Sequence, residues 1–162
     1  MFSTLILTVG IPGAGKTTWA NKYMSKHPLT HLIRTDKIRE EMFGTMECDP
    51  SQSASVHDEA RKRVKAILAD NSLDEGIGPV ILVDSTNVEL MEWLKYKELG
   101  PSIMIAVLFD VKPEDGWKHS QKKEKGVAPL YAHNLKYNQL QKNKPFMRQI
   151  FNMVIDYNTS HL

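Results

Sequence analysis

The residues best suited to chemistry lie near the start of the chain. Gly10, Gly15, Lys16 and Thr17 occupy the fixed positions of the pattern G-x-x-x-x-G-K-[ST]. The apolar residues 4–9 predict a buried strand before this segment, and residues 16–26 predict a helix after it, which is the context that the pattern requires. Glycines let the backbone turn several N–H groups inward at a helix N-terminus, where they attract anions. We therefore expect this loop to bind the phosphates of a nucleoside triphosphate.

The types of residue in the loop predict how it would hold its ligands. The ammonium group of Lys16 would reach the β- and γ-phosphates, and the hydroxyl group of Thr17 would bind Mg²⁺. The predicted cofactors are therefore ATP, or another nucleoside triphosphate, and Mg²⁺. The predicted nucleotide-binding residues are Gly13, Ala14, Gly15, Lys16, Thr17 and Thr18.

Acidic residues follow two further predicted strands. Residues 31–35 lead to Asp36, and the apolar residues 79–83 lead to Asp84. Ligands of open α/β sheets bind outside the carboxyl ends of the strands. An apolar strand that closes on Asp is the Walker B arrangement, so we expect Asp84 to hold Mg²⁺ directly or through water.

Asp36 is the candidate general base, because a carboxylate near the γ-phosphate can accept the proton of an acceptor hydroxyl. Arg39 follows one helical turn later and can face the same cleft. Two simpler interpretations stay open at this point. Asp36 can be only the N-cap of the helix predicted for residues 36–43, and Arg39 can be only a solvated charge.

The elements that must position these residues alternate along the chain. Further strands are expected at residues 102–109 and 151–157, and further helices at 56–71, 88–99, 114–125 and 129–141, with a loop at 44–54. This alternation predicts an α/β fold with a mainly parallel sheet of about five strands. The strand at 4–9 is apolar on both faces, which is typical of a central strand.

Composition bounds the class of protein. The 162 residues suit one domain, and 41% hydrophobic with 25% charged residues is ordinary for a globular protein. A net charge of +2 does not by itself identify a nucleic-acid binder. Cys48 is the single cysteine, so no intrachain disulfide can form. The N-terminus enters a strand at once and the apolar runs are short, so we expect a cytoplasmic protein without a membrane segment.

Two predicted helices carry cations. Arg61, Lys62, Arg63 and Lys65 cluster on the helix at 56–71, and the helix at 114–125 ends in Lys118, His119, Lys122, Lys123 and Lys125. A charge run on an amphipathic helix is usually its solvated face. A nucleic-acid contact is the less favoured interpretation of the first cluster.

Several motifs together resemble the phage-type polynucleotide 5′-hydroxyl kinases. Residues 10–20 resemble their phosphate loop, including Pro12-Gly13 within the loop and Trp19-Ala20 after it. The spacing of Asp36 and Arg39 matches their Asp-x-x-Arg motif. The segment 83–87, Val-Asp-Ser-Thr-Asn, is similar to their Asp-Thr-Asn turn with one residue interposed. The likeness extends over nearly the whole chain.

The resemblance implies a fold, a domain and a reaction. The fold would be the three-layer sandwich of P-loop kinases, formed by one kinase domain at 1–162 with a helical lid near 113–129. The reaction would transfer the γ-phosphate of ATP to the 5′-hydroxyl end of DNA or RNA. The partner would therefore be a nucleic acid with such an end, while the oligomeric state stays open.

The resemblance also implies roles for individual residues. Asp36 would be the general base, Arg39 would hold a phosphate of the acceptor strand, and Thr86 would line the acceptor site, with Asn87 and His119 as further substrate contacts. The lid of the family offers two arginines one turn apart, and His119 and Lys123 stand at those places here. Lysine keeps the charge but not the planar bidentate contact, so Lys123 is a catalytic candidate. We expect no phosphatase activity, because residues 156–158 are not an Asp-x-Asp motif.

Two other functions fit the same residues. The acceptor can be a modified DNA base, a nucleoside or a small metabolite, because one P-loop scaffold serves all of these. The chain can also be a non-catalytic nucleic-acid-binding module that depends on a nucleoside triphosphate.

Overall fold

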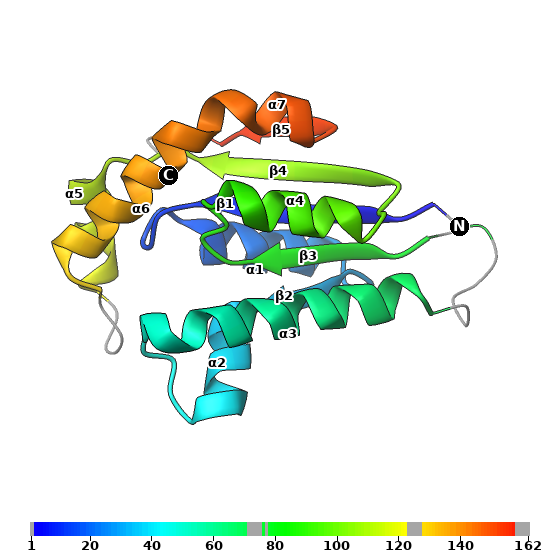
Figure 1. Ribbon diagram of the computed structural model, residues 1–162, viewed down its shortest axis with the longest axis horizontal. Helices are drawn as coiled ribbons and strands as arrows, with labels where there is room; N and C mark the ends of the chain where they lie inside the picture. The colour runs from blue at the N-terminus through cyan, green and yellow to red at the C-terminus, as the bar shows by residue number, and fades with distance from the viewer. Residues whose placement is uncertain (1, 71–75, 77, 123–127, 158–162) are drawn as a thin grey trace.

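A five-stranded parallel sheet forms the centre of the protein (Figure 1). The computed structural model describes residues 2–70, 76, 78–122 and 128–157. The strands are β1 (Thr4–Gly10), β2 (His31–Arg34), β3 (Val80–Asp84), β4 (Ile103–Phe109) and β5 (Met153–Asp156), in the spatial order β2-β3-β1-β4-β5. The expected α/β fold with about five parallel strands and a central first strand is confirmed.

The sheet lies between two layers of helices because its strands are apolar on both faces. Leu5, Leu7 and Val9 of β1 point into one core cluster, and Ile6 points into another. Helix α1 (Lys16–Lys26) covers the Ile6 face. The opposite face is covered by α2 (Thr35–Phe43), α3 (Pro50–Leu68) and α4 (Leu90–Glu98). This is the expected three-layer sandwich.

The carboxyl ends of the strands all lie on one side, at the left of Figure 1. The loop after β1, the start of α2 and the turn after β3 therefore meet at one edge of the sheet. Helices α5 (Pro113–Ser120) and α6 (Leu130–Asn143) also lie at that edge. After α6 come the 3-10 turn η1 (Lys144–Phe146) and the short helix α7 (Met147–Ile150). The topology thus brings the motif-bearing segments together.

Helix α3 begins at Pro50, so the predicted loop at 44–54 and the predicted start at residue 56 are wrong. The Asp49 carboxylate accepts a hydrogen bond from the backbone N–H of Ser51 at 2.9 Å, and Pro50 stands in the first turn. Hydrogen bonds from the hydroxyl and the N–H of Ser51 lower the pKa of Asp49. Asp followed by Pro is an N-cap signal as well as a turn signal. In this protein Asp49 and Pro50 begin a helix and do not form a turn.

Other boundaries shift less. Helix α5 ends at Ser120 rather than at Lys125, and Lys123 with the other residues 123–127 lies outside the described residues. Helix α6 continues to Asn143 rather than ending at residue 141, and η1 follows it directly. Helix α4 starts at Leu90, two residues later than expected, since Val88 is buried in the turn after β3.

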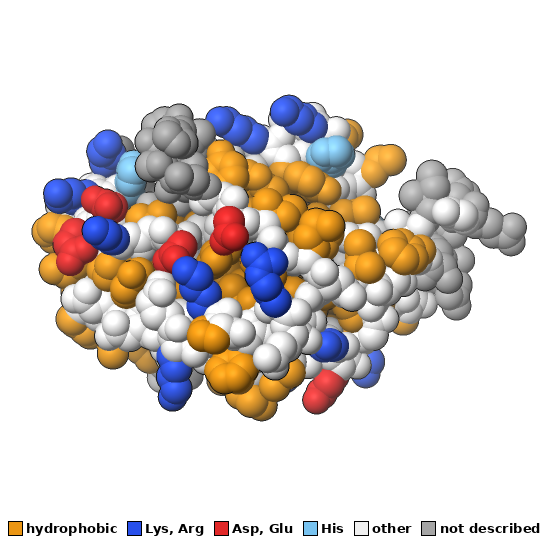
Figure 2. Space-filling view, turned by 90° about the horizontal axis from the view of Figure 1, so that it is seen from above, with side chains coloured by type: hydrophobic (Ala, Val, Ile, Leu, Met, Phe, Trp, Pro, Cys, Tyr) orange, Lys and Arg blue, Asp and Glu red, His pale blue; other side chains and the backbone are white. Residues whose placement is uncertain are grey.

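Strand β5 is an edge of the sheet, paired only with β4 within the described residues. Figure 2 looks onto the side of β5 and α7 and shows hydrophobic side chains gathered between acidic and basic ones. Met153 and Ile155 are among the exposed apolar residues here. Asp156 and Arg148 form an ion pair at 3.8 Å on the same side. Over the described residues, no helix combines the length and apolar character needed to cross a bilayer.

Candidate active site

The loop after β1 has the backbone conformation that a phosphate-binding loop requires. Gly13 and Gly15 have φ values of 76° and 97°, a region that favours glycine, and Gly15 is the N-cap of α1. The Lys16 side chain is buried, and its Nζ donates to the carbonyl oxygen of Ile11 at 2.6 Å. The ammonium group is therefore folded back over the loop, where a phosphate bound to the N-terminus of α1 would contact it.

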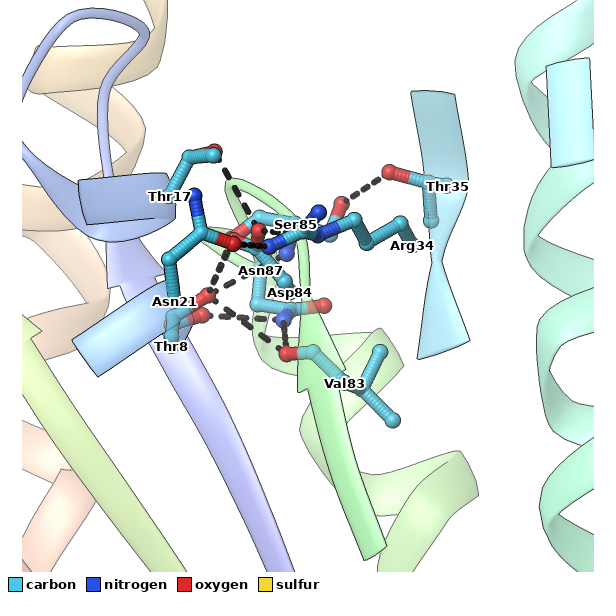
Figure 3. Close-up of polar contacts among 9 residues, drawn as sticks. All are labelled: Thr8, Thr17, Asn21, Arg34, Thr35, Val83, Asp84, Ser85 and Asn87. Carbon is cyan, nitrogen blue, oxygen red and sulfur yellow. Dashed lines mark hydrogen bonds and ion pairs between the residues drawn. The ribbon is translucent and has the colours of Figure 1, made fainter. Parts of the chain in front are cut away.

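Thr17 and Asp84 face one another across the gap between α1 and β3 (Figure 3). The hydroxyl of Thr17 donates to Oδ2 of Asp84 at 3.2 Å. Neighbouring ligands of an octahedral Mg²⁺ lie about 2.9 Å apart, since each is 2.0–2.1 Å from the ion. The donor set and its spacing therefore fit Mg²⁺. The described residues contain no group of three or more His, Cys, Asp or Glu that could hold a metal ion. Few protein ligands are usual where phosphates and water complete the shell.

Asp84 is held by more than Thr17. The hydroxyl of Thr8, on β1, donates to Oδ1 of Asp84 at 3.3 Å and to the carbonyl of Ser85 at 2.9 Å. The guanidinium group of Arg34, at the end of β2, has its Nε 3.3 Å from Oδ2 of Asp84. Arg34 also donates to the side-chain oxygen of Asn21 on α1. Side chains from two neighbouring strands and one helix thus contact the carboxylate at the end of β3 (Figure 3).

Asp36 and Arg39 form a pair in the first turns of α2. Nη1 of Arg39 donates to Oδ1 of Asp36 at 3.3 Å. The Arg39 side chain is only 7% exposed, whereas that of Asp36 is 67% exposed. The N-cap of α2 is Arg34, so the interpretation of Asp36 as a helix cap is wrong. The interpretation of Arg39 as a solvated charge is also wrong. A buried guanidinium group thus lies beside an accessible carboxylate, and the roles of the two residues in acceptor binding stay predictions.

A chain of hydroxyl groups connects this pair to the phosphate side. Thr35, the neighbour of Asp36, donates from Oγ1 to Oγ of Ser85 at 2.9 Å. The backbone N–H of Ser85 donates to Oγ1 of Thr8 at 3.1 Å. The start of α2 is therefore tied to β1, which carries the phosphate-binding loop. This link sets the position of Asp36 relative to the loop.

Thr86 and Asn87 lie in the turn after β3, next to the start of the loop. The carbonyl oxygen of Thr86 accepts from the N–H of Gly10 at 2.9 Å. Asn87 is buried with φ 46°, and its Nδ2 donates to the carbonyl of Thr8 at 2.9 Å. The amide group of Asn87 thus supports the turn. Contacts of Thr86 and Asn87 with an acceptor stay predictions.

Helix α5 packs directly on the phosphate-binding loop. A Cβ atom placed on Gly13 would lie 2.0 Å from the carbonyl oxygen of Gly116 and 2.6 Å from Oγ of Ser120. The buried ring of His133, on α6, contacts Oγ of Ser120 through Nε2 at 3.2 Å and the carbonyl of Pro129 through Nδ1 at 3.0 Å. The carbonyl oxygen can only accept, so Nδ1 carries a proton. Helix α5, the first part of the predicted lid, is therefore joined to α6 and packed on the phosphate-binding loop.

The lid candidates are only partly described. His119 is exposed in the last turn of α5. Lys123 lies outside the described residues, so its predicted role stays a prediction. Asp110, at the end of β4, accepts from Gln141 at 2.9 Å and from Lys144 at 2.6 Å. The hydrogen bond to Asp110 raises the pKa of Lys144. This third strand-end carboxylate is therefore paired to α6 and η1.

The basic cluster of α3 offers less unpaired charge than its sequence suggests. Arg61 forms ion pairs with Glu92 and Asp58. Arg63 contacts Glu41 at 2.7 Å and Glu59 at 3.1 Å. Glu92, on α4, is the buried partner of Arg61. The two arginines thus support packing between helices rather than a nucleic-acid surface.

Sequence reasoning missed four residues that build the site: Thr8, Asn21, Arg34 and Ser85. Arg34 lies two residues after Leu32 in β2, so the two side chains point to the same face of the sheet, the one that α1 covers. The spacing of Leu32 and Arg34 could have shown which face Arg34 occupies. It could not have shown the contact with Asp84, because that contact depends on the pairing of β2 with β3.

The comparisons with known proteins agree with this geometry. The family model described as an AAA domain matches residues 5–143, well over half of the chain. A chain in the structure of the Pnkp1/Rnl/Hen1 RNA repair complex is similar with a TM-score of 0.71 at 23% identity, over 89% of this chain and 46% of that one. A second structure of the Pnkp1/Rnl/Hen1 complex gives 0.59 at 20% identity, over 79% and 41% of the two chains. This chain thus spans less than half the length of these two relatives.

A gluconokinase from Sinorhizobium meliloti 1021 is similar with a TM-score of 0.62 at 14% identity, over 98% of this chain and 84% of that one. The structural likenesses establish the kinase-type fold, and the family match establishes the domain type. They confirm the predicted likeness to P-loop domains of the polynucleotide kinase type. The chain belongs to the family of P-loop proteins described as an AAA domain.

Proposed function

We propose that this chain is a kinase that transfers the γ-phosphate of ATP to the 5′-hydroxyl end of DNA or RNA. The observation that carries the proposal is the Asp36–Arg39 pair, an accessible carboxylate against a buried guanidinium group at the carboxyl edge of the sheet. The neighbours found in an RNA repair complex support a nucleic acid as the acceptor.

Arg39 has the properties of an anion-binding group. Its guanidinium group is buried, its Nε has no hydrogen-bond partner among the described residues, and its ion-pair partner Asp36 is largely exposed. Buried charged groups are costly unless they are paired and hydrogen-bonded. A phosphate of the acceptor strand would supply the missing acceptors, because guanidinium matches phosphate geometry.

Asp36 would then act as the general base for the 5′-hydroxyl group of the acceptor. Its carboxylate would accept the proton of the 5′-hydroxyl as that oxygen attacks the γ-phosphorus, while the bond to the β,γ-bridging oxygen breaks and ADP leaves. Lys16 would neutralise charge on the transferred phosphate. Thr17 and Asp84 would hold the Mg²⁺ that accompanies ATP, and Thr86 and His119 would contact the acceptor strand. The 67% exposure of Asp36 suits an acceptor that enters as the end of a long polymer.

The alternative with a specific observation in its favour is a small-molecule kinase. The gluconokinase match covers 98% of this chain and 84% of that protein, so the two share most of their architecture. A small acceptor needs an enclosed pocket. One groove in the described residues is lined mainly by α6, η1, α7 and β5, and another by α3 and α4. Neither groove includes Asp36 or Arg39.

The test is transfer of label from γ-labelled ATP in the presence of Mg²⁺. Oligonucleotides of DNA and RNA with 5′-hydroxyl ends are compared with nucleosides and gluconate. We expect labelled oligonucleotides. Label on a small acceptor alone would replace the proposal with the small-molecule kinase, and ATP binding without any labelled acceptor would favour a binding module.

The Asp36→Asn variant tests the base. We expect transfer to fall by about 10³-fold with ATP binding unchanged, since proton abstraction contributes about 10²–10⁴-fold. Asp156→Asn is the matched control, because Asp156 is also 67% exposed and also paired with an arginine. An Asp36→Asn enzyme as active as Asp156→Asn would remove Asp36 from the mechanism.

A further inference from the structure

The guanidinium group of Arg34 lies next to Asp84 and Thr17, the two side chains proposed to bind Mg²⁺. Its Nε is 3.3 Å from Oδ2 of Asp84, the same oxygen that accepts the hydroxyl of Thr17 at 3.2 Å. Figure 3 shows the guanidinium group reaching from β2 toward the tip of β3, with Thr17 on the other side. Any cation held by Thr17 and Asp84 would therefore lie close to the guanidinium group.

The position of Arg34 is fixed from two sides. Its guanidinium group donates to the side-chain oxygen of Asn21 on α1, and its side chain is 24% exposed. The side chain of Asp84 is 5% exposed. A carboxylate this buried needs a compensating charge, and the Thr8 and Thr17 hydroxyls offer only dipoles. Arg34 supplies a full positive charge 3.3 Å from this carboxylate.

The guanidinium group also opposes a second cation. Arginine stays protonated at every ordinary pH, so its charge cannot be removed when a metal ion arrives. The repulsion between a guanidinium group and a divalent ion a few ångströms away is strong in a partly buried site. The several negative charges of a nucleoside triphosphate would offset that repulsion. The carboxylate of Asp84, already paired with Arg34, would not offset it alone.

We propose that Arg34 is a positioning residue that fixes Asp84 against Thr17 and keeps the divalent cation out until the nucleotide arrives. The inference rests on the donor half of the proposed function and is independent of the acceptor. The proposal assigns two effects to the Arg34 side chain. The charge of Arg34 sets the metal affinity of the nucleotide-free protein, and its ion pair with Asp84 holds that carboxylate near Thr17.

The experiment measures Mn²⁺ binding by electron paramagnetic resonance, with and without ADP, in the whole chain. We expect the wild-type protein to bind no Mn²⁺ at micromolar concentrations without nucleotide and to bind it with ADP. Arg34→Gln keeps a hydrogen-bond donor but removes the charge. It should bind Mn²⁺ without nucleotide at least about tenfold more tightly than the wild type. Arg34→Lys keeps the charge and should match the wild type.

Arg148→Met is the matched control for net charge, because Arg148 is exposed and its partner is Asp156 on the β5 edge. It should leave Mn²⁺ binding unchanged. Micromolar Mn²⁺ binding by the nucleotide-free wild type would overturn the proposal even if no Arg34 variant folds. Unchanged or weaker Mn²⁺ binding by a folded Arg34→Gln variant would overturn it as well.

Two further measurements separate this inference from its alternatives. In EDTA, ATP and ADP should bind Arg34→Gln with the same ratio of affinities as the wild type. A selective loss of ATP binding would show that Arg34 contacts the γ-phosphate and would refute the positioning role. The Mn²⁺ measurements need no acceptor. The inference therefore survives if the chain phosphorylates no nucleic acid, and it fails on metal binding alone.

Discussion

The contact between the phosphate-binding loop and α5 can be tested by adding one methyl group at Gly13. Gly13 has a φ value of 76°, and a Cβ there would lie 2.0 Å from the backbone oxygen of Gly116. Real Cβ contacts are essentially never under 3.0 Å, so the loop or α5 must move by at least 1.0 Å. The Gly13→Ala variant therefore tests whether α5 supports the loop.

Gly44 offers a matched control. Its φ value is 74°, and a Cβ there would meet nothing within 4 Å. Gly44→Ala thus carries the same left-handed strain, about 1–2 kcal/mol of unfolding free energy, without the steric contact. Gly13→Ala should cost that amount plus about 1–3 kcal/mol for overpacking. The difference between the two variants isolates the contact with α5.

The functional effect should follow the displacement of the loop. A misplacement of about 1 Å in a catalytic site can reduce the rate by about 10²-fold. We expect Gly13→Ala to lose most of its ATP affinity in calorimetry and to transfer phosphate at least 10²-fold more slowly. Gly44→Ala should do neither. If the two variants show the same unfolding free energy and the same ATP affinity, α5 does not lie against the loop, and the predicted steric effect at Gly13 is refuted.

Two further predictions concern the helices behind the site. Glu92→Gln leaves Arg61 without its buried partner, whose side chain is 10% exposed, while Asp58 stays in place. The variant should lose about 3 kcal/mol of unfolding free energy in urea. Replacing both partners with apolar residues should restore most of that loss, and a single variant as stable as the wild type would contradict the ion pair. Burial lowers the pKa of His57, against the opposing effect of Glu92. The wild type should therefore lose stability as the pH falls from about 7 to about 5, because the unfolded chain binds the proton at about pH 6.5 and the folded chain resists it. His57→Gln should flatten this slope by up to about 1.4 kcal/mol per pH unit, and an unchanged slope would assign the pH dependence to other groups.

The fold was predictable where local patterns are strong. The apolar strand predicted at residues 4–9, the glycine-rich loop and the helix after it follow from a pattern whose spacing requires one backbone conformation. The start of α3 was not predictable in the same way. Asp49 and Pro50 suit both a turn and a helix start, and packing of α3 against β2 and α2 selects the helix.

The candidate site also has some features that were predictable from local sequence patterns and others that were not. The sequence alone determined a phosphate-binding loop and two strand-end carboxylates, because these depend on short-range spacing and on the rule that ligands bind at the carboxyl ends of parallel strands. Only the tertiary structure decided that Arg34 contacts Asp84, that Arg39 is buried beside Asp36, and that α5 lies on Gly13. These contacts depend on which strands are neighbours and on how closely helices approach the loop. Residues far apart in the chain meet only when the order β2-β3-β1 brings their side chains to one face.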